Sequence, residues 1–323
     1  MKQMEAPVGV LSGSGRDDPG YGHVVNKGAL PTLKDRPLAY LLLLPSVILI
    51  CGLVVTPFFQ AFFYSFTDKH TVIPEYSFIG FDNYLSFFRQ PDFPEAFKNS
   101  VVWTVGSVVL ELILGLYVSL VLQKHFKLRG LARAVVLFPY LIPTIVAVLV
   151  WRFMMHDLLG VVNYGLMAVG IVKQPVLWFS NTDTAMMGVI IVGVWKFFPF
   201  VVIALLGILQ SIPSETYEAA RVDGANMFDE LWHITMPAIM PVFLLTALLR
   251  TIWTWDKFDI IYLLTGGGPV NSTTTLPIFV YREAFDHWQM GRASAVAMVT
   301  FAVLLVCTLV YLRMYDKAEG AAR

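Results

Sequence analysis

The stretch Glu218-Ala219-Ala220-Arg221-Val222-Asp223-Gly224 lies between two long apolar runs, and its continuation reaches Met236-Pro237. Pro213 followed by Ser214 is typical of a helix start. Gly224 predicts the end of that first helix, because glycine adopts the left-handed conformation that closes a helix. A second helical run is expected up to Met236, where Pro237 opens the next apolar run. The apolar side chains expected to hold both short helices against a membrane are Phe228, Leu231, Trp232 and Ile234.

The composition places the chain in a membrane. Its 323 residues are 57% hydrophobic and only 14% charged, whereas soluble domains contain about 25% charged residues. The formal net charge is zero, so nothing in the charge balance indicates a nucleic-acid partner. The two cysteines, Cys51 and Cys307, both lie in apolar runs and are interpreted as small hydrophobic side chains rather than a redox pair.

Six stretches are long and apolar enough to cross a bilayer, which takes about 20 residues in a helix. The sequence therefore predicts an all-α membrane protein with six transmembrane helices. The predicted spans are Leu38–Phe66, Val101–Gln123, Ala134–Met155, Thr184–Gln210, Ala238–Trp255 and Ala293–Met314.

Lysine and arginine set the expected orientation, because they gather in cytoplasmic loops. They are dense before the first span, between the second and third spans, and after the last. These cations are Lys27, Lys34, Arg36, Lys124, Lys127, Arg129, Arg133, Arg313, Lys317 and Arg323. Both termini are therefore predicted to be cytoplasmic, and the segment 212–237 falls on the same side.

The predicted organisation has four parts. Residues 1–37 form a cytosolic, largely disordered tail without the apolar core of a signal peptide. Residues 38–96 hold the first transmembrane helix and a periplasmic loop, residues 97–314 form the core domain, and residues 315–323 form a cytosolic tail.

Three outer loops have a character of their own. Residues 76–98 are aromatic-rich and are interrupted by Pro91 and Pro94. Residues 161–173 have helical apolar spacing and are expected to lie along the membrane interface. Residues 265–272 read as a flexible glycine-rich turn; no strand precedes it and no Lys-Ser/Thr follows, which argues against a phosphate-binding loop.

The spacing around Glu218 is similar to the EAA signature of the permeases of ABC importers. That signature is Glu-Ala-Ala, three residues, Gly, nine residues, Ile, one residue and Leu-Pro, and here it is met by Gly224, Ile234 and Met236-Pro237. Met for Leu, the single departure, conserves volume. From about Phe97 to Met314 the chain most resembles the maltose-type class of carbohydrate permeases. Stretches typical of that class are Asp259–Pro269, Arg282–Phe285 and Gly291–Ala295.

The resemblance implies a type I importer permease fold in a bacterial cytoplasmic membrane, without the large periplasmic domain of the enterobacterial maltose permease. It implies that the loop 212–237 docks an ATPase, with Glu218 pairing with an arginine of that subunit. The residues that the signature assigns to coupling are Glu218, Ala219, Ala220, Asp223 and Gly224. In the loop itself, the small alanines permit close approach, and Glu218 and Asp223 offer carboxylates.

The implied partners are a second related permease, two ATPase subunits and a periplasmic or lipid-anchored substrate-binding protein. The chain has no Gly-x-x-x-x-Gly-Lys-Ser/Thr motif. ATP and Mg are therefore expected to bind to a separate subunit, and this chain is predicted to be non-catalytic and to carry no cofactor.

Cations inside the spans are candidate functional groups, since each costs at least about 2.5–3.5 kcal/mol at mid-membrane. They are Lys196, Arg250 and, near the outer end of the third span, Arg152. In the maltose-type family these parts of the fourth and fifth spans line the sugar site. The residues at matching positions are Trp195, Lys196, Phe197, Phe200, Arg250, Trp253, Thr254 and Lys257.

The aromatic members of this set suit stacking on sugar rings, and its cations suit an anion. We therefore expect an acidic oligosaccharide such as an oligouronate, with a neutral oligosaccharide, a sugar phosphate or glycerol phosphate as alternatives. Internal pairing is the competing interpretation: Asp256 or Asp259 could neutralise Lys257, and Lys196 could reach the interface. Glu111 in the second span could pair with Arg250.

Other classes of protein fit less well. A secondary transporter would use inverted repeats, and none is visible in this sequence. A membrane enzyme would need clustered titratable groups, but the six histidines lie in loops or at span ends without metal-ligand spacing. A permease for amino acids remains an alternative, against which Leu263-Leu264-Thr265-Gly266-Gly267-Gly268-Pro269 favours carbohydrate.

Overall fold

The computed structural model describes residues 36–322, and they are helical apart from short connections and one isolated bridge between Thr67 and Phe78. Residues 1–35, nearly all of the predicted N-terminal tail, lie outside the described part, as does Arg323. The chain divides into two units after Thr56.

The described part of the first unit is a helix with a π-helical turn. It consists of α1 (Arg36–Ile50) and η1 (Cys51–Val55), and the helix continues as α2 (Thr56–Tyr64). The candidate span Tyr40–Tyr64 has a mean hydropathy of 2.5. Its apolar side chains are exposed, as expected of a helix whose solvent is lipid. The first predicted span is confirmed.

The second unit contains the remaining helices. In chain order they are α3 (Asp82–Phe88), α4 (Asp92–Gln123), α5 (Arg129–Leu141), α6 (Thr144–Met154), α7 (Val161–Ala168), α8 (Thr182–Leu209), α9 (Ser214–Val222), α10 (Met227–Glu230), η2 (Leu231–Thr235), α11 (Met236–Trp255), α12 (Asp259–Thr265), α13 (Leu276–Tyr281), η3 (Arg282–Asp286) and α14 (Met290–Ala322).

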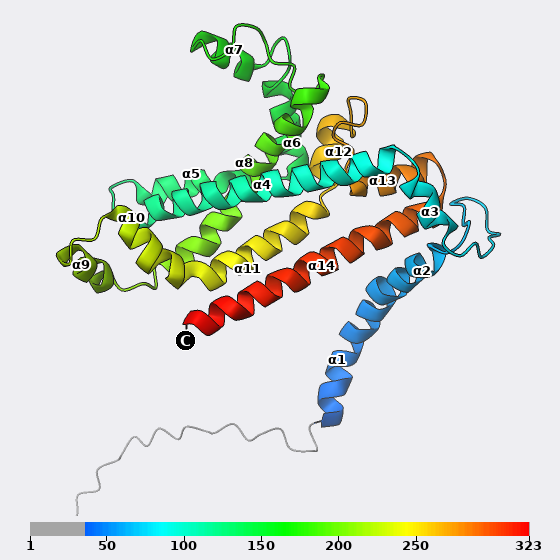
Figure 1. Cartoon of the computed structure of the whole chain (residues 1–323), viewed down its shortest axis with the longest axis horizontal. Helices are drawn as coiled ribbons and strands as arrows, with labels where there is room; N and C mark the ends of the chain where they lie inside the picture. The colour runs from blue at the N-terminus through cyan, green and yellow to red at the C-terminus, as the bar shows by residue number, and fades with distance from the viewer. Residues whose placement is uncertain (1–35, 323) are drawn as a thin grey trace, which may run out of the picture. The chain divides into compact units, whose positions relative to one another are not determined.

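By length and composition, five helical segments of the described chain could each cross a membrane, and six if the bent pair α5–α6 forms one span. The helices α4, α8, α11 and α14 make up most of the bundle in Figure 1, where α11 contacts the other three and α4 contacts α8. Small residues allow the closest approach: a Cβ on Gly115 of α4 would lie 2.5 Å from Val201, and one on Gly193 of α8 would lie 2.5 Å from Trp103.

The third span, predicted as one helix over 134–155, is broken. α5 ends at Leu141, α6 begins at Thr144, and the two axes are bent by 99°. Pro143 has no N–H to continue the helical ladder, and its ring pushes Ile142 into an extended conformation with φ −69° and ψ 136°. The break leaves the last carbonyl groups of α5 without helical donors.

Two boundaries also differ from prediction. α4 begins at Asp92, inside the predicted loop 76–98, because Pro91 precedes the helix and Pro94 lies in its first turn, where no N–H is needed. α14 remains helical to Ala322, through the segment predicted as a tail from residue 315. The fifth span ends at Trp255 and α7 forms within 161–173, as predicted.

The glycine-rich turn 265–272 is held in place rather than flexible. Arg282 donates hydrogen bonds to the Asn271 side chain at 2.6 Å and to the Gly266 carbonyl at 2.8 Å. Asn99 of α4 donates to the Asn271 and Thr274 carbonyls at 2.9 and 3.2 Å. The prediction of a flexible turn was wrong because both partners lie outside the turn, and Asn99 lies on a helix more than 170 residues earlier in the sequence.

α8 extends from one end of the bundle to the other. It has 28 residues, which correspond to a length of about 42 Å at 1.5 Å per residue. At its C-terminal end, Gln123 of α4 donates a hydrogen bond to the Leu209 carbonyl at 3.0 Å, and the segment 212–237 follows. The residues before its N-terminus lie beside α6 and α12. The segment 212–237 and the α6–α12 region therefore lie at opposite ends of a membrane-length helix.

Candidate functional site

The first helix of the segment 212–237 ends at Gly224, as predicted. α9 covers Ser214–Val222, and Gly224 has φ +89°. The Ala225 N–H donates to the Ala220 carbonyl at 2.9 Å and the Gly224 N–H to the Arg221 carbonyl at 3.1 Å. This pair of bonds is a Schellman motif, which satisfies the carbonyls at a helix end and requires a left-handed residue. Gly224 therefore fixes the angle at which the chain leaves α9.

The second helix begins with a capping box. The Asn226 side chain accepts from the Phe228 and Asp229 N–H groups, and the Asp229 carboxylate accepts from the Asn226 N–H at 3.0 Å. From Met227 the helix continues through the π turn η2 into α11 without a break. The prediction of a separate short helix ending before Pro237 was therefore wrong: Pro237 lies inside the continuous helix, directly after the π turn η2, where the regular pattern of helical hydrogen bonds is already interrupted.

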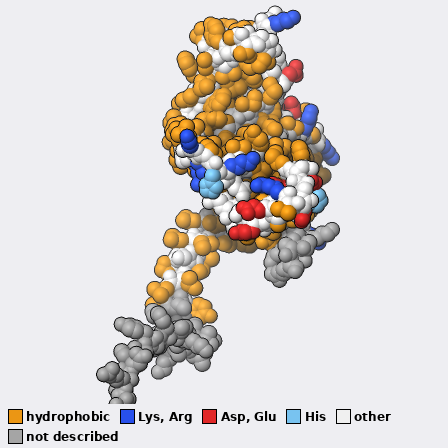
Figure 2. All heavy atoms as spheres, turned by 90° about the vertical axis from the view of Figure 1, so that its left-hand side faces the viewer, with side chains coloured by type: hydrophobic (Ala, Val, Ile, Leu, Met, Phe, Trp, Pro, Cys, Tyr) orange, Lys and Arg blue, Asp and Glu red, His pale blue; other side chains and the backbone are white. Residues whose placement is uncertain are grey.

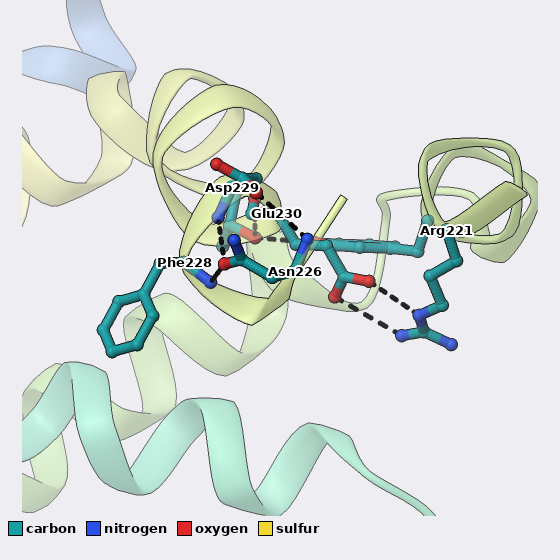
Figure 3. A network of polar contacts seen from close by, with 7 residues as sticks. Arg221, Asn226, Phe228, Asp229 and Glu230 are labelled. Atoms are coloured by element: carbon teal, nitrogen blue, oxygen red, sulfur yellow. Dashed lines mark hydrogen bonds and ion pairs between the residues drawn. The ribbon is translucent and has the colours of Figure 1, made fainter. Parts of the chain in front are cut away.

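Polar contacts tie α9 to the start of this long helix (Figure 3). Arg221 and Glu230 form an ion pair, with Nε to Oε1 at 2.6 Å and Nη2 to Oε2 at 3.4 Å. The hydrogen bond and the charge of Glu230 raise the pKa of Arg221. The hydroxyl groups of Tyr217 and Thr235 lie 3.0 Å apart. These contacts brace α9 against the helix that continues into α11.

The outer face of the segment is open in the isolated chain. Glu218, Ala219, Asp223 and Gly224 are exposed, and Ala220 is half-buried. Figure 2, which views the side that faces left in Figure 1, shows acidic and basic side chains gathered below a mainly apolar surface. Of the side chains expected to hold the loop on the membrane, Leu231 and Ile234 are half-buried. Phe228 and Trp232 remain 69% and 64% exposed.

The second group of predicted site residues lies around Phe197 of α8. Its ring, 8% exposed, has three cations within cation–π range. The Lys196 ammonium is 5.8 Å from the ring centroid, the Arg250 guanidinium carbon 4.9 Å, and the Lys257 ammonium 5.0 Å. The fold thus brings together four of the eight residues predicted to bind substrate.

Arg250 forms a buried pair with Glu111, one of the partners considered from the sequence. The Arg250 Nε and Nη2 atoms donate to the two Glu111 carboxylate oxygens at 2.6 and 2.9 Å. The two side chains are only 3% and 1% exposed. Arg250 Nη2 also donates to the Thr254 hydroxyl at 3.2 Å. The pair links α11 to α4 inside the bundle.

Lys196 caps the broken third span. Its ammonium group donates to the Pro139 carbonyl at 3.1 Å, the Tyr140 carbonyl at 3.4 Å and the Ile142 carbonyl at 2.5 Å. Lysine has three donors, and these acceptors lie where Pro143 interrupts α5. A cation at a helix C-terminus is also favoured by the helix dipole. The side chain does not snorkel outward, since Lys196 is 3% exposed.

The remaining polar members also have partners within the chain. Lys257 lies 3.7 Å from the Asp259 carboxylate, and both side chains are partly exposed. The Thr254 carbonyl accepts a hydrogen bond from the Trp103 indole at 2.8 Å. All three cations therefore have intrachain partners, and their predicted contact with substrate stays a prediction.

Two of the aromatic members, Phe200 and Trp253, are more exposed than Lys196 and Arg250. Phe200 packs edge-on against Trp253 of α11, with centroids 5.0 Å apart, and lies 6.2 Å from the Tyr140 ring of α5. Trp253 and Tyr140 are 43% and 37% exposed. We call Tyr140, Phe200 and Trp253 the aromatic platform. The sequence did not indicate Tyr140 as a site residue, because only the break in the third span places its ring beside Phe200. Trp195 packs separately, 5.3 Å from Trp151.

These features define a class of protein: a helical membrane permease with a braced, exposed helical loop at one end and an aromatic and charged cluster within the bundle. The chain belongs to the family of binding-protein-dependent transport system inner membrane components, whose family model matches residues 111–316. It is therefore a multi-pass permease subunit of an ABC importer in the cytoplasmic membrane.

Relatives match over most of their lengths. A trehalose/maltose transport system permease protein of Thermococcus litoralis is 37% identical over 284 residues, 87% of this chain and 94% of the relative. A sulfoquinovosyl glycerol transport system permease protein of Agrobacterium fabrum is 35% identical over 284 residues, 87% of this chain and 91% of the relative.

Solved structures show the same fold. A bacterial ABC transporter involved in the import of the acidic polysaccharide alginate matches with a TM-score of 0.75 and 24% identity, over 88% of this chain and 96% of that chain. The alginate transporter in complex with a pentasaccharide-bound periplasmic protein matches with a TM-score of 0.76 and 22% identity, over the same shares. The type I importer permease fold predicted from the sequence is confirmed.

Proposed function

We propose that this permease imports an oligosaccharide and that the segment 212–237 docks a separate ATPase subunit. The observation that carries the docking proposal is the construction of the segment: a short exposed helix braced at 2.6 Å to the first turn of a continuous helix 227–255. A displacement of α9 would therefore be transmitted to α11, the helix that contains Arg250 and Trp253. The predicted partners are two ATPase subunits that bind ATP and Mg, a second related permease, and a substrate-binding protein.

Glu218 is proposed as the contact to a cation of the ATPase. Its carboxylate lies on the exposed face of α9, and Ala219 and Ala220 beside it leave room for another backbone. The Arg221 side chain is already held by Glu230, so Glu218 remains available for a partner. Hydrogen-bonded charge pairs of this kind, once closed off from water, typically lose 2–5 kcal/mol when one side is removed.

Glu218→Ala is expected to uncouple ATP hydrolysis from transport. In proteoliposomes that contain the whole importer, sugar uptake should fall at least about tenfold, because loss of 1.4 kcal/mol already corresponds to a factor of ten in docking. Glu215→Ala removes an exposed carboxylate from the first turn of the same helix and is the matched control. Normal uptake by the Glu218→Ala importer would contradict the docking proposal.

The aromatic platform supports a carbohydrate as the transported substrate. Flat aromatic faces suit the apolar faces of pyranose rings, and this platform combines half-exposed rings from α5, α8 and α11. Two relatives above 30% identity are named for transport of trehalose/maltose and of sulfoquinovosyl glycerol. The aromatic platform suits an oligosaccharide, and the first of these relatives is named for oligosaccharide transport, so an oligosaccharide is the proposed class of substrate.

An acidic oligosaccharide is the proposed substrate within that class. Arg250 and Lys257 face Glu111 and Asp259, whereas Lys196 has no acidic side chain within ion-pair distance in the described part of the chain. The cluster around Phe197 therefore carries a net positive charge that would favour an anion. One observation favours the alternative, a neutral oligosaccharide: Glu111 and Asp259 neutralise two of the three cations in this cluster.

A substrate panel separates the two candidates. The reconstituted importer is assayed for ATPase stimulation by its binding protein loaded with oligouronates, maltose or trehalose. We expect stimulation by an oligouronate to exceed that by the neutral sugars at least about tenfold, the ratio that 1.4 kcal/mol of discrimination gives. Equal or greater stimulation by a neutral sugar would overturn the acidic substrate and leave the importer function intact.

A further inference from the structure

A cavity of about 560 Å³ lies at the end of the bundle opposite the docking segment. It is formed by the end of α6, the residues just before α8, and α12. Figure 1 shows α6 and α12 together, away from α9 and α10. The volume falls within the range of about 300–1,000 Å³ typical of small-molecule sites.

The lining of the cavity has the chemistry of a sugar site. Its polar members include Arg152, His156, Asp157, Ser180 and Thr265. Ser180 donates to the Asp157 carboxylate at 2.5 Å, which holds the acid in place. No hydrogen bond or ion pair joins Arg152 to another residue of the described chain, so its guanidinium is free to bind a ligand oxygen.

Tyr262 supplies an aromatic wall. Its ring stacks on Phe258 with centroids 4.7 Å apart and an interplanar angle of 20°, which fixes its orientation. Tyr262 remains 37% exposed. Phe258 in turn packs against the core cluster that contains Phe197. The wall of the cavity is thus connected to the cluster proposed to take part in transport.

We propose that this cavity is an entry site, where the sugar binds after leaving the binding protein and before it reaches the aromatic platform. Tyr262 stacks on a sugar ring, and Arg152 binds a hydroxyl or a carboxylate. The inference rests on the proposed import of an oligosaccharide. A loop of the binding protein would also bind on this face, but a polar cavity with a free guanidinium and one aromatic wall fits a sugar better than an apolar side chain.

The first test measures protection of an engineered cysteine. Ser180→Cys is placed in an importer without Cys51 and Cys307 and is labelled with a membrane-impermeant maleimide. Maltose, trehalose or an oligouronate trimer alone should slow labelling at least about threefold, as expected when a ligand occupies most copies. Val270→Cys, 84% exposed and outside the cavity, should label at an unchanged rate. Protection by the sugar-free binding protein but by no sugar would overturn the proposal.

The second test removes the aromatic wall. Tyr262→Ala should raise the concentration of loaded binding protein needed for half-maximal uptake by roughly two- to tenfold, the range that an aromatic contact of 0.5–1.5 kcal/mol gives. Tyr262→Phe keeps the ring and should stay near wild type. If wild-type importer takes up no sugar, the proposed function fails; if it takes up sugar and Tyr262→Ala equals Tyr262→Phe, only the entry site fails.

Discussion

Replacing Glu111 with alanine is expected to lower the free energy of unfolding by about 3–5 kcal/mol, the usual penalty for leaving a buried partner charge uncompensated. Arg250 would keep its place in α11, 3% exposed, without the two carboxylate oxygens it binds at 2.6 and 2.9 Å. The thermal stability of the purified importer measures the loss. Sugar uptake should also fall for acidic and neutral oligosaccharides alike.

The control replaces both partners. Glu111→Leu with Arg250→Met removes the two charges together and should recover most of the stability, because an apolar pair of similar size can replace a buried ion pair. Glu95→Ala removes an exposed carboxylate from the same helix α4 and should change little. If Glu111→Ala alone is as stable as wild type, Arg250 does not depend on this pair, and its role as a substrate ligand gains support.

The spans and the end of the first helix in the segment 212–237 could be predicted from the sequence because their signals are local. Each apolar run of membrane length is one continuous stretch of sequence, and the glycine after α9 acts within one turn of helix. Gly224 was recognisable as a helix end since a φ of +89° strongly favours glycine. Pro237 led to the wrong prediction of a helix boundary because the π turn η2 before it lets the helix continue past a proline.

The sequence offered Glu111 and Asp259 only as possible partners of Arg250 and Lys257, and it gave no sign of the acceptors of Lys196. Arg250 and Glu111 are 139 residues apart in the sequence, and Lys196 binds carbonyl groups more than 50 residues away. A backbone carbonyl has no signature in the sequence, so the acceptors of Lys196 could not be identified before the break at Pro143 was seen. The sequence therefore predicted Lys196 as a substrate ligand, whereas its observed contacts are those of a side chain that caps the end of α5.

The second large effect is expected for Lys196→Met, which keeps the length of the side chain and removes its three donors. The carbonyls of Pro139, Tyr140 and Ile142 would then lie inside the bundle without the donor that now reaches them. An unsatisfied buried group costs about 1–3 kcal/mol. We therefore expect a loss of roughly 3 kcal/mol or more and a loosened bend between α5 and α6.

Spin labels on Val135 of α5 and Leu149 of α6, both exposed, measure the bend as a distance distribution, which should broaden in Lys196→Met. Lys173→Met, an exposed lysine before α8, is the matched control. A lysine that only binds a substrate anion would leave this distribution unchanged and would reduce uptake of acidic sugars alone. A lysine that caps the broken span changes the distribution without any sugar and reduces uptake of every sugar, because Tyr140 of the aromatic platform is held through that cap. Since the same ammonium supplies the net positive charge of the cluster, a broadened distribution together with a larger loss for acidic sugars would show that the cap also attracts the substrate.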